Sequence, residues 1–115
     1  MRTVYPLVRY RNPVKGIDWL VQAFGFEVHA IHKDDDGVVG HAELTVGTGM
    51  IMTGTGEPGG PGIYVVVDDP DAHHARAVAA GAEVTRELAD QSYGSRDYAC
   101  KDLEGNEWFF GTYGP

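Results

Sequence analysis

The chain has few of the features that mark secreted or membrane proteins. A single cysteine among 115 residues, Cys100, excludes an internal disulfide and is compatible with a reducing compartment. Cys100 has no evident activating partner in the sequence, so we expect a small buried residue. No apolar run approaches the ~20 residues of a membrane span, and the first residues lack the apolar core of a signal peptide. These absences predict a cytoplasmic protein with no membrane partner.

Positive charge is also scarce. Nine Lys and Arg residues stand against 17 Asp and Glu residues, which gives a net charge of −8. Without a basic cluster to neutralise phosphates, nucleic acid is excluded as a partner. An acidic protein attracts cationic small molecules, but acidity also favours solubility, so the charge alone decides little. A hydrophobic content of 43% is ordinary for a globular protein, and the length fits one domain.

What the chain does contain is an internal duplication at a spacing of about 57 residues. Asn12-Pro13 begins a stretch that ends at Gly25-Phe26-Glu27-Val28, and Asp69-Pro70 begins one that ends at Gly81-Ala82-Glu83-Val84. In each copy, Asn or Asp caps a helix, Pro takes the first helical position and Gly ends the helix with a left-handed residue. A strand-like run precedes each copy. This repeat predicts a duplicated module, and duplicated modules build shared surfaces.

Each half is predicted to fold as a strand, a helix and three strands. The first helix, at 13–24, places Ile17, Leu20, Val21 and Phe24 on one apolar stripe. The second helix, at about 70–80, is expected to use Ala75, Val78 and Ala79 as its apolar face. The strands are expected at 3–11, 26–33, 38–46 and 50–53, and then at 62–68, 82–89, 95–102 and 107–113.

The domain organisation follows from this pattern. Residues 1–53 form a first βαβββ module and 63–115 a second, so the fold class is α+β. The segment 54–62 has the Gly/Pro composition of a flexible or extended linker. It matches G-x-G-x-x-G by letter, but a strand follows it, so no helix N-terminus is available for a pyrophosphate.

Two pairs of histidines lie close together in the sequence, but neither pair predicts a metal site. His73 and His74 are adjacent on a helix and diverge by about 100°, so we expect them to be solvated. His29 and His32 lie three residues apart on a strand and are expected to face opposite sides.

Two βαβββ modules that end in Asp102-Leu103-Glu104-Gly105-Asn106-Glu107-Trp108-Phe109-Phe110 resemble the vicinal oxygen chelate superfamily, which includes glyoxalase I, bleomycin resistance proteins and extradiol dioxygenases. The segment Tyr93-Gly94-Ser95-Arg96 and the end of the chain look like the bleomycin-resistance branch. The resemblance covers essentially the whole chain. It implies cup-shaped sheets that pair around a cavity and a homodimer, with the modules exchanged between chains or kept within one.

Metal-dependent members of that superfamily hold a divalent cation with four inward side chains. Carried over one at a time, the four positions fall on Tyr5, Glu43, Gly62 and Phe109. Glu43 alone keeps a ligand, and with His41 on the same strand face it makes at most a partial site. The resemblance therefore implies no metal and no other cofactor. It leaves enzymatic activity open, with a non-enzymatic protein as the favoured interpretation.

Alternation along the strands predicts which side chains line the cups. Trp108 and Phe110 turn toward the helices, whereas Phe109 turns inward. Arg96, Tyr98 and Cys100 share one face of their strand, but the sequence does not say which. The predicted ligand-binding residues are Tyr5, Leu7, Arg9, His41, Glu43, Met52, Tyr64, Tyr93, Glu107 and Phe109.

A lining of aromatic rings, thioethers and carboxylates suits an aromatic, antibiotic-like compound that can carry positive charge. The predicted function is sequestration of such a compound, with no catalytic residue. A simpler role for Glu43 is an ion pair with Arg9 across neighbouring strands. Two other functions stay open: a metal-dependent glyoxalase-like lyase or isomerase, in which Glu43 ligates an ion that polarises a carbonyl, and a protein that shares only the fold.

Overall fold

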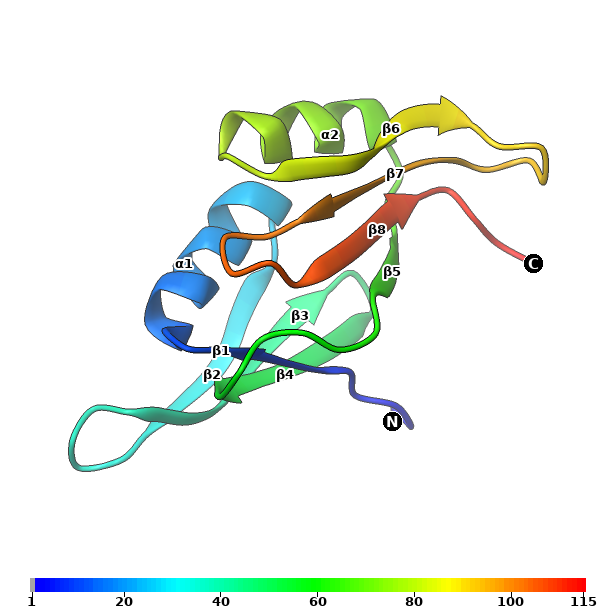
Figure 1. The fold of residues 1–115 in the computed structure, drawn as a ribbon. Coiled ribbons are helices and arrows are strands. Elements are labelled where there is room, and N and C mark those ends of the chain that lie inside the picture. The colour runs from blue at the N-terminus through cyan, green and yellow to red at the C-terminus, as the bar shows by residue number, and fades with distance from the viewer. Residues whose placement is uncertain (1) are drawn as a thin grey trace.

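The structure is a computed structural model that describes residues 2–115. It confirms the α+β fold with two βαβββ modules (Figure 1). The first module contains β1 (Leu7–Tyr10), α1 (Pro13–Phe24), β2 (Glu27–Lys33), β3 (Val39–Val46) and β4 (Gly49–Thr55). The second contains β5 (Ile63–Val66), α2 (Pro70–Ala79), β6 (Glu83–Asp90), β7 (Arg96–Lys101) and β8 (Glu107–Gly111).

Each module forms one four-stranded sheet, and the two sheets have the same topology. The strand orders are β1-β4-β3-β2 and β5-β8-β7-β6. The pairs β1–β4 and β5–β8 are parallel, and all other pairs are antiparallel. Helix α1 packs on one face of the first sheet and α2 on one face of the second (Figure 1). The opposite face of each sheet, which we call its open face, carries no helix.

All eight strands lie where they were predicted, but several ends differ. Strands β5 and β8 each end two residues earlier than predicted, and β1 and β4 differ as well. The first strand is shorter than predicted, because only Leu7 to Tyr10 find backbone partners in β4. Strand β4 in turn runs two residues further than predicted, because Gly54 and Thr55 pair with the end of β1.

Both helix starts have the predicted caps. The Asn12 side chain accepts a hydrogen bond from the Lys15 amide at 3.2 Å, and Asp69 accepts one from the Ala72 amide at 3.1 Å. Gly25, directly after α1, has a φ of +76°, and Gly81, two residues after α2, has a φ of +95°. These left-handed conformations end the helices where the sequence placed glycine.

The two modules share one hydrophobic core. From the predicted stripe of α1, Ile17, Leu20 and Phe24 are buried, whereas Val21 lies at the edge of the stripe and is 37% exposed. The Phe24 ring lies 5.5 Å from Trp108 and 4.6 Å from Phe110, between centroids. Since Trp108 and Phe110 belong to β8, this contact joins the first helix to the second sheet.

Hydrogen bonds between the helices reinforce this contact. The Trp19 indole donates to the Ala80 carbonyl at 2.8 Å. Arg76 of α2 donates to the carbonyls of Gln22 and Val21 at 2.8 and 3.2 Å, in the last turn of α1. The Val21 carbonyl also accepts from the Gly25 amide at 3.1 Å.

The predicted apolar face of α2 is wrong. Val78 is 45% exposed, and the helix buries Pro70 and Ala77 instead. His73 lies one turn before Ala77 and is half-buried, not solvated as predicted. Its ring lies 4.1 Å from that of Phe110, and Nδ1 is 2.6 Å from the Tyr98 hydroxyl. An imidazole has an apolar body, so it can replace an aliphatic side chain in this core.

This buried imidazole predicts a loss of stability in mild acid. Burial lowers the pKa of His73 from 6.5 to about 4. The unfolded chain therefore takes up the proton first, so the stability contributed by neutral His73 is complete above pH 6.5 and is lost as the pH falls toward 4. Because the ring is only partly buried, we expect a loss of about 1–2 kcal/mol. Denaturant titrations at pH 7 and 4.5 measure how much the free energy of unfolding falls between the two pH values. This fall should be smaller for His73→Gln than for the wild type or for His29→Gln. Equal falls in all three proteins would show that His73 does not cause the loss of stability.

A second junction joins β1 to the turn between β7 and β8. The buried Asp102 carboxylate accepts hydrogen bonds from the Tyr10 hydroxyl at 2.6 Å and from the Trp108 indole at 3.0 Å. Glu104 of the same turn accepts from the backbone amides of Arg11 and Asn12 at 2.7 and 2.9 Å. The Asp-x-Glu-Gly-Asn turn of the second module therefore positions the end of β1 and the start of α1.

No helix among residues 2–115 combines the length and the apolar character that a membrane crossing requires.

Candidate functional site

The open faces of the two sheets carry most of the predicted ligand-binding residues. On the first sheet, Leu7, Met52 and Glu43 follow one another across β1, β4 and β3 in register. On the second sheet, Tyr64 of β5 pairs in register with Phe109 of β8. Each set is therefore contiguous, as expected from strand alternation.

Histidines surround Glu43 on the first open face. His41 Nε2 lies 2.8 Å from one Glu43 oxygen, and His29 Nε2 lies 3.9 Å from the other. The rings of His32 and His41 stack with 5.7 Å between centroids. The prediction that His29 and His32 face opposite sides is wrong, because a bulge between Val28 and Ala30 interrupts the alternation of β2.

The alternative role for Glu43, an ion pair with Arg9, is not formed, because β4 lies between β1 and β3 and Glu43 pairs with histidines instead. Arg9 donates to the Thr55 carbonyl at 3.5 Å, and its aliphatic stem passes close to Gly56. The hydrogen bond from His41 holds the pKa of the Glu43 carboxyl below its ordinary value, and the nearby His29 acts in the same direction. Glu43 is thus a carboxylate with histidine neighbours on a half-exposed sheet face.

The remaining metal-ligand positions do not fit a divalent cation. Gly62 and Phe109 are spatial neighbours, and a Cβ added at Gly62 would clash with the Phe109 ring, lying 3.1 Å from its Cδ2. The ring therefore fills the space into which a ligand at position 62 would project. Among residues 2–115, no three His, Cys, Asp or Glu side chains converge as a metal site. The chemistry of the side chains at these positions is that of an apolar, aromatic surface.

The second open face contains a polar cluster that the sequence reasoning missed. Asp97 is 3% exposed and lies beside Tyr64, whose hydroxyl donates to its Oδ2 at 3.2 Å. Ser95 Oγ donates to the same oxygen at 2.9 Å. Arg86 Nη2 lies 3.9 Å from the other oxygen and donates to the Tyr93 hydroxyl at 3.3 Å.

The cluster was not predicted because the sequence left open which residues of β7 face the helices. Tyr98 pairs in register with Phe110 and Cys100 with Trp108, so these residues and Arg96 belong to the helix-covered face. Asp97 and Ala99 therefore belong to the open face with Phe109. The sequence of β7 gave no clear signal, because Tyr98, Ala99 and Cys100 are consecutive apolar residues and both faces of the strand are buried.

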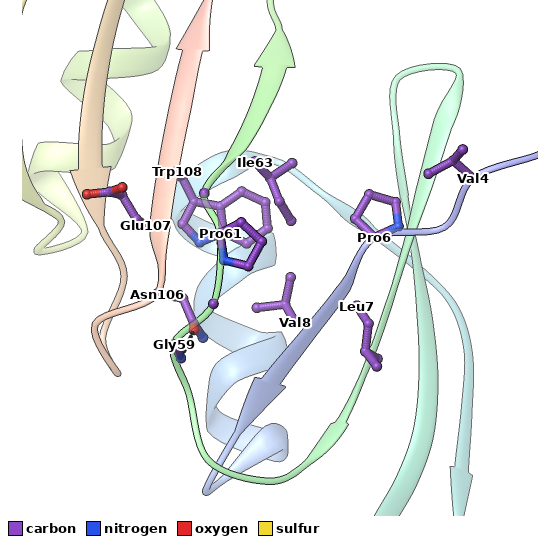
Figure 2. A pocket seen from close by; sticks show the side chains of 12 residues that line it. Val4, Pro6, Leu7, Val8, Gly59, Pro61, Ile63, Asn106, Glu107 and Trp108 are labelled. Carbon is purple, nitrogen blue, oxygen red and sulfur yellow. Dashed lines mark hydrogen bonds between the residues drawn. The ribbon is translucent and has the colours of Figure 1, made fainter.

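Two grooves run along the seam between the modules. The first has a volume of about 320 Å³, and in Figure 2 Pro6 and Leu7 lie on one side of it and Pro61 and Ile63 on the other. The second has about 400 Å³ and brings Met50 of the first open face together with Tyr64 and Val66 of the second. Both are open grooves lined mainly by apolar side chains.

The predicted residues divide between these features. Leu7 and Glu107 line the first groove, and Tyr64 lines the second. Tyr93 lies at the far end of the second open face, against Tyr113 at 6.3 Å between ring centroids. Tyr5 precedes β1 and is 38% exposed. In the described part of a single chain, neither groove combines the Leu7–Met52–Glu43 set with Phe109.

Cys100 is buried, as predicted. Burial raises the pKa of its thiol to about 12, so the sulfur stays protonated at neutral pH. It lies on the helix-covered face and contributes packing, not nucleophilic chemistry.

Comparison with known proteins gives a consistent result. The model of the Glyoxalase/Bleomycin resistance protein/Dioxygenase superfamily matches residues 3–110. TioX from Micromonospora sp. ML1 is 34% identical, with 99% of this chain and 98% of TioX covered and a TM-score of 0.83. No match was found among curated proteins.

More distant structures share the fold. A superfamily member from Sphaerobacter thermophilus is 18% identical, with 98% of each chain covered and a TM-score of 0.78. A V278E mutant of glyoxalase I from Zea mays is 16% identical, with a TM-score of 0.81. That match covers 99% of this chain and 45% of the maize chain.

Proposed function

Because the chain belongs to the glyoxalase/bleomycin resistance protein/dioxygenase superfamily, we propose that it is a metal-independent binding protein of the bleomycin-resistance type, which sequesters an aromatic small molecule. The observation that carries this proposal is the Phe109 ring beside Gly62. It replaces two of the four expected ligand positions with an aromatic surface.

The rest of the lining supports the same function. Tyr5, Tyr64 and the half-buried Phe109 offer rings for stacking, and each aromatic pair contributes about 0.5–1.5 kcal/mol beyond the burial of its area. Met50 and Met52 adapt to irregular shapes. Glu43, ionised beside its histidines, can pair with a positive group of the ligand.

A second copy of the chain would complete the site. Leu7 is 50% exposed and Val66 is 64% exposed, so both open faces are uncovered in one chain. Small-molecule sites usually bury most of the ligand surface. We therefore propose a homodimer in which open faces of two chains enclose the ligand.

Native mass spectrometry and calorimetry test the proposal. Protein stripped with a chelator is exposed to nickel, zinc, manganese or iron(II), and we expect no ion to be retained after desalting and a mass of two chains. Titration of the same protein with metal-free bleomycin is expected to give saturable heat. One ion retained per site, or no heat with bleomycin or any other planar aromatic compound, would contradict the proposal.

A further inference from the structure

The buried carboxylate of Asp97 has one satisfied oxygen and one without a partner. Oδ2 accepts hydrogen bonds from Ser95 and Tyr64. Oδ1 is buried and accepts none from the residues that the structure describes. A buried acceptor without a donor is costly, and native proteins rarely keep one without a reason. Oδ1 is therefore a candidate contact for a donor that the chain itself does not supply.

Arg86 is close to Asp97 but does not fill this role. Its Nη2 lies 3.9 Å from Oδ1, which is beyond hydrogen-bond distance, and donates to Tyr93 instead. The Arg86 side chain is 45% exposed, whereas that of Asp97 is 4% exposed. Arg86 is thus the solvent-facing member of the pair, and displacing its side chain would not unpack the core.

Glycine at position 111 is required for this arrangement. A Cβ at Gly111 would lie 2.5 Å from the Tyr64 hydroxyl and would also clash with Asp97. Without a side chain there, the tyrosine and the carboxylate approach each other over β8.

Three tyrosine rings lie next to the pair. The Tyr64 and Tyr113 rings meet edge to face with 6.0 Å between centroids, and Tyr93 meets Tyr113 in the same way at 6.3 Å. The Tyr113 amide donates to the Tyr64 hydroxyl at 3.0 Å, which fixes this hydroxyl as a donor toward Asp97. The polar pair therefore lies beside a row of three tyrosines, with Tyr64 in contact with Asp97 and Tyr93 in contact with Arg86.

We infer that Asp97 and Arg86 together recognise a neutral carboxamide group on an aromatic ligand. Any neutral group that places a hydrogen-bond donor next to an acceptor would serve equally. The ligand N–H donates to Asp97 Oδ1, and its carbonyl accepts from the Arg86 guanidinium. A ligand ammonium is disfavoured here, because Arg86 already balances the carboxylate charge and would repel a second cation. This inference rests on the proposed aromatic binding site and names the polar group that the site selects.

Three probes with the same ring system test it: 2-naphthamide, methyl 2-naphthoate and 2-(aminomethyl)naphthalene. Binding is measured by NMR titration of the full chain, with the backbone amides of β7 as reporters. The amide is expected to bind about tenfold or more tightly than the ester, because the ester offers no N–H to the carboxylate.

Two variants locate the effect. Asp97→Asn can keep the hydrogen bonds from Ser95 and Tyr64 through its carbonyl, but it turns the unpaired acceptor into a donor, so the preference for the amide should disappear. Arg86→Gln removes the guanidinium at an exposed position where folding is not at risk, and it should weaken amide binding severalfold. Asp90→Asn, whose side chain is 84% exposed, is the matched control and should change nothing.

The outcomes separate the inference from the proposed function. Equal binding of amide and ester to the wild type would leave the aromatic site intact and overturn the inference. Tightest binding of the ammonium, improved further by Arg86→Gln, would also overturn it. If none of the three probes binds, the aromatic site itself is contradicted, and the inference fails with it.

Discussion

Replacing Asp102 by alanine is expected to lower the free energy of unfolding by about 3–5 kcal/mol, because a charged acceptor is removed from several buried donors at once. One carboxylate oxygen accepts from the Tyr10 hydroxyl and the Trp108 indole. The other accepts from the backbone amides of Glu104 and Asn106, both at 3.0 Å. The substitution leaves these donors without partners in a site where Asp102 is 6% exposed.

Urea denaturation at one fixed protein concentration measures this effect, since a dimer would make stability depend on concentration. Asp71→Ala is the control, because its carboxylate pairs with Arg96 at 2.9 Å but is 62% exposed, and we expect less than about 1 kcal/mol there. Similar unfolding midpoints for the two variants would show that the Asp102 network does not join the modules. Asp102→Asn, which keeps one acceptor oxygen, should lie between alanine and the wild type.

Replacing Phe109 by alanine is expected to weaken the binding of a planar aromatic ligand by about tenfold or more. The ring is half-buried on the open face, between Tyr64 and the space in front of Gly62, so truncation removes a stacking partner and opens the surface. Calorimetric titration with bleomycin measures the change. Tyr5→Ala should weaken binding in the same direction.

Leu103→Ala provides the control for these variants. Leu103 is a 43% exposed apolar residue in the turn between β7 and β8. The Leu103→Ala variant therefore loses an exposed apolar side chain, as the other two variants do, but away from the open faces. Its affinity should equal that of the wild type. If Phe109→Ala and Tyr5→Ala bind bleomycin as tightly as the wild type while remaining folded, the ligand does not bind at the open faces of the sheets.

The sequence by itself determined the elements and their order. Caps at Asn12 and Asp69 and glycines at the helix ends act within a few residues, so a local pattern is enough to place them. Alternation likewise predicted that Trp108 and Phe110 enter the core, because a strand buried on one face leaves little choice of register.

Tertiary structure decided which side chains from different strands and helices come into contact. The β2 bulge that directs His29 toward Glu43 depends on the register with β3. The burial of His73 depends on contacts with Phe110 and Tyr98 from the opposite end of the module. Neither feature follows from local periodicity, because each depends on residues far away in the chain.

The candidate site shows the same division. The sequence identified Tyr64 and Phe109 as inward residues, and the parallel pairing of β5 with β8 makes them neighbours. It did not identify Asp97, because the face of a short strand with mixed polarity is set by the strands beside it and not by its own residues. The partnership of Asp97 with Arg86 from β6, beside Tyr64 from β5, exists only once the second sheet has formed, and long-range pairing of this kind is what a linear pattern cannot encode.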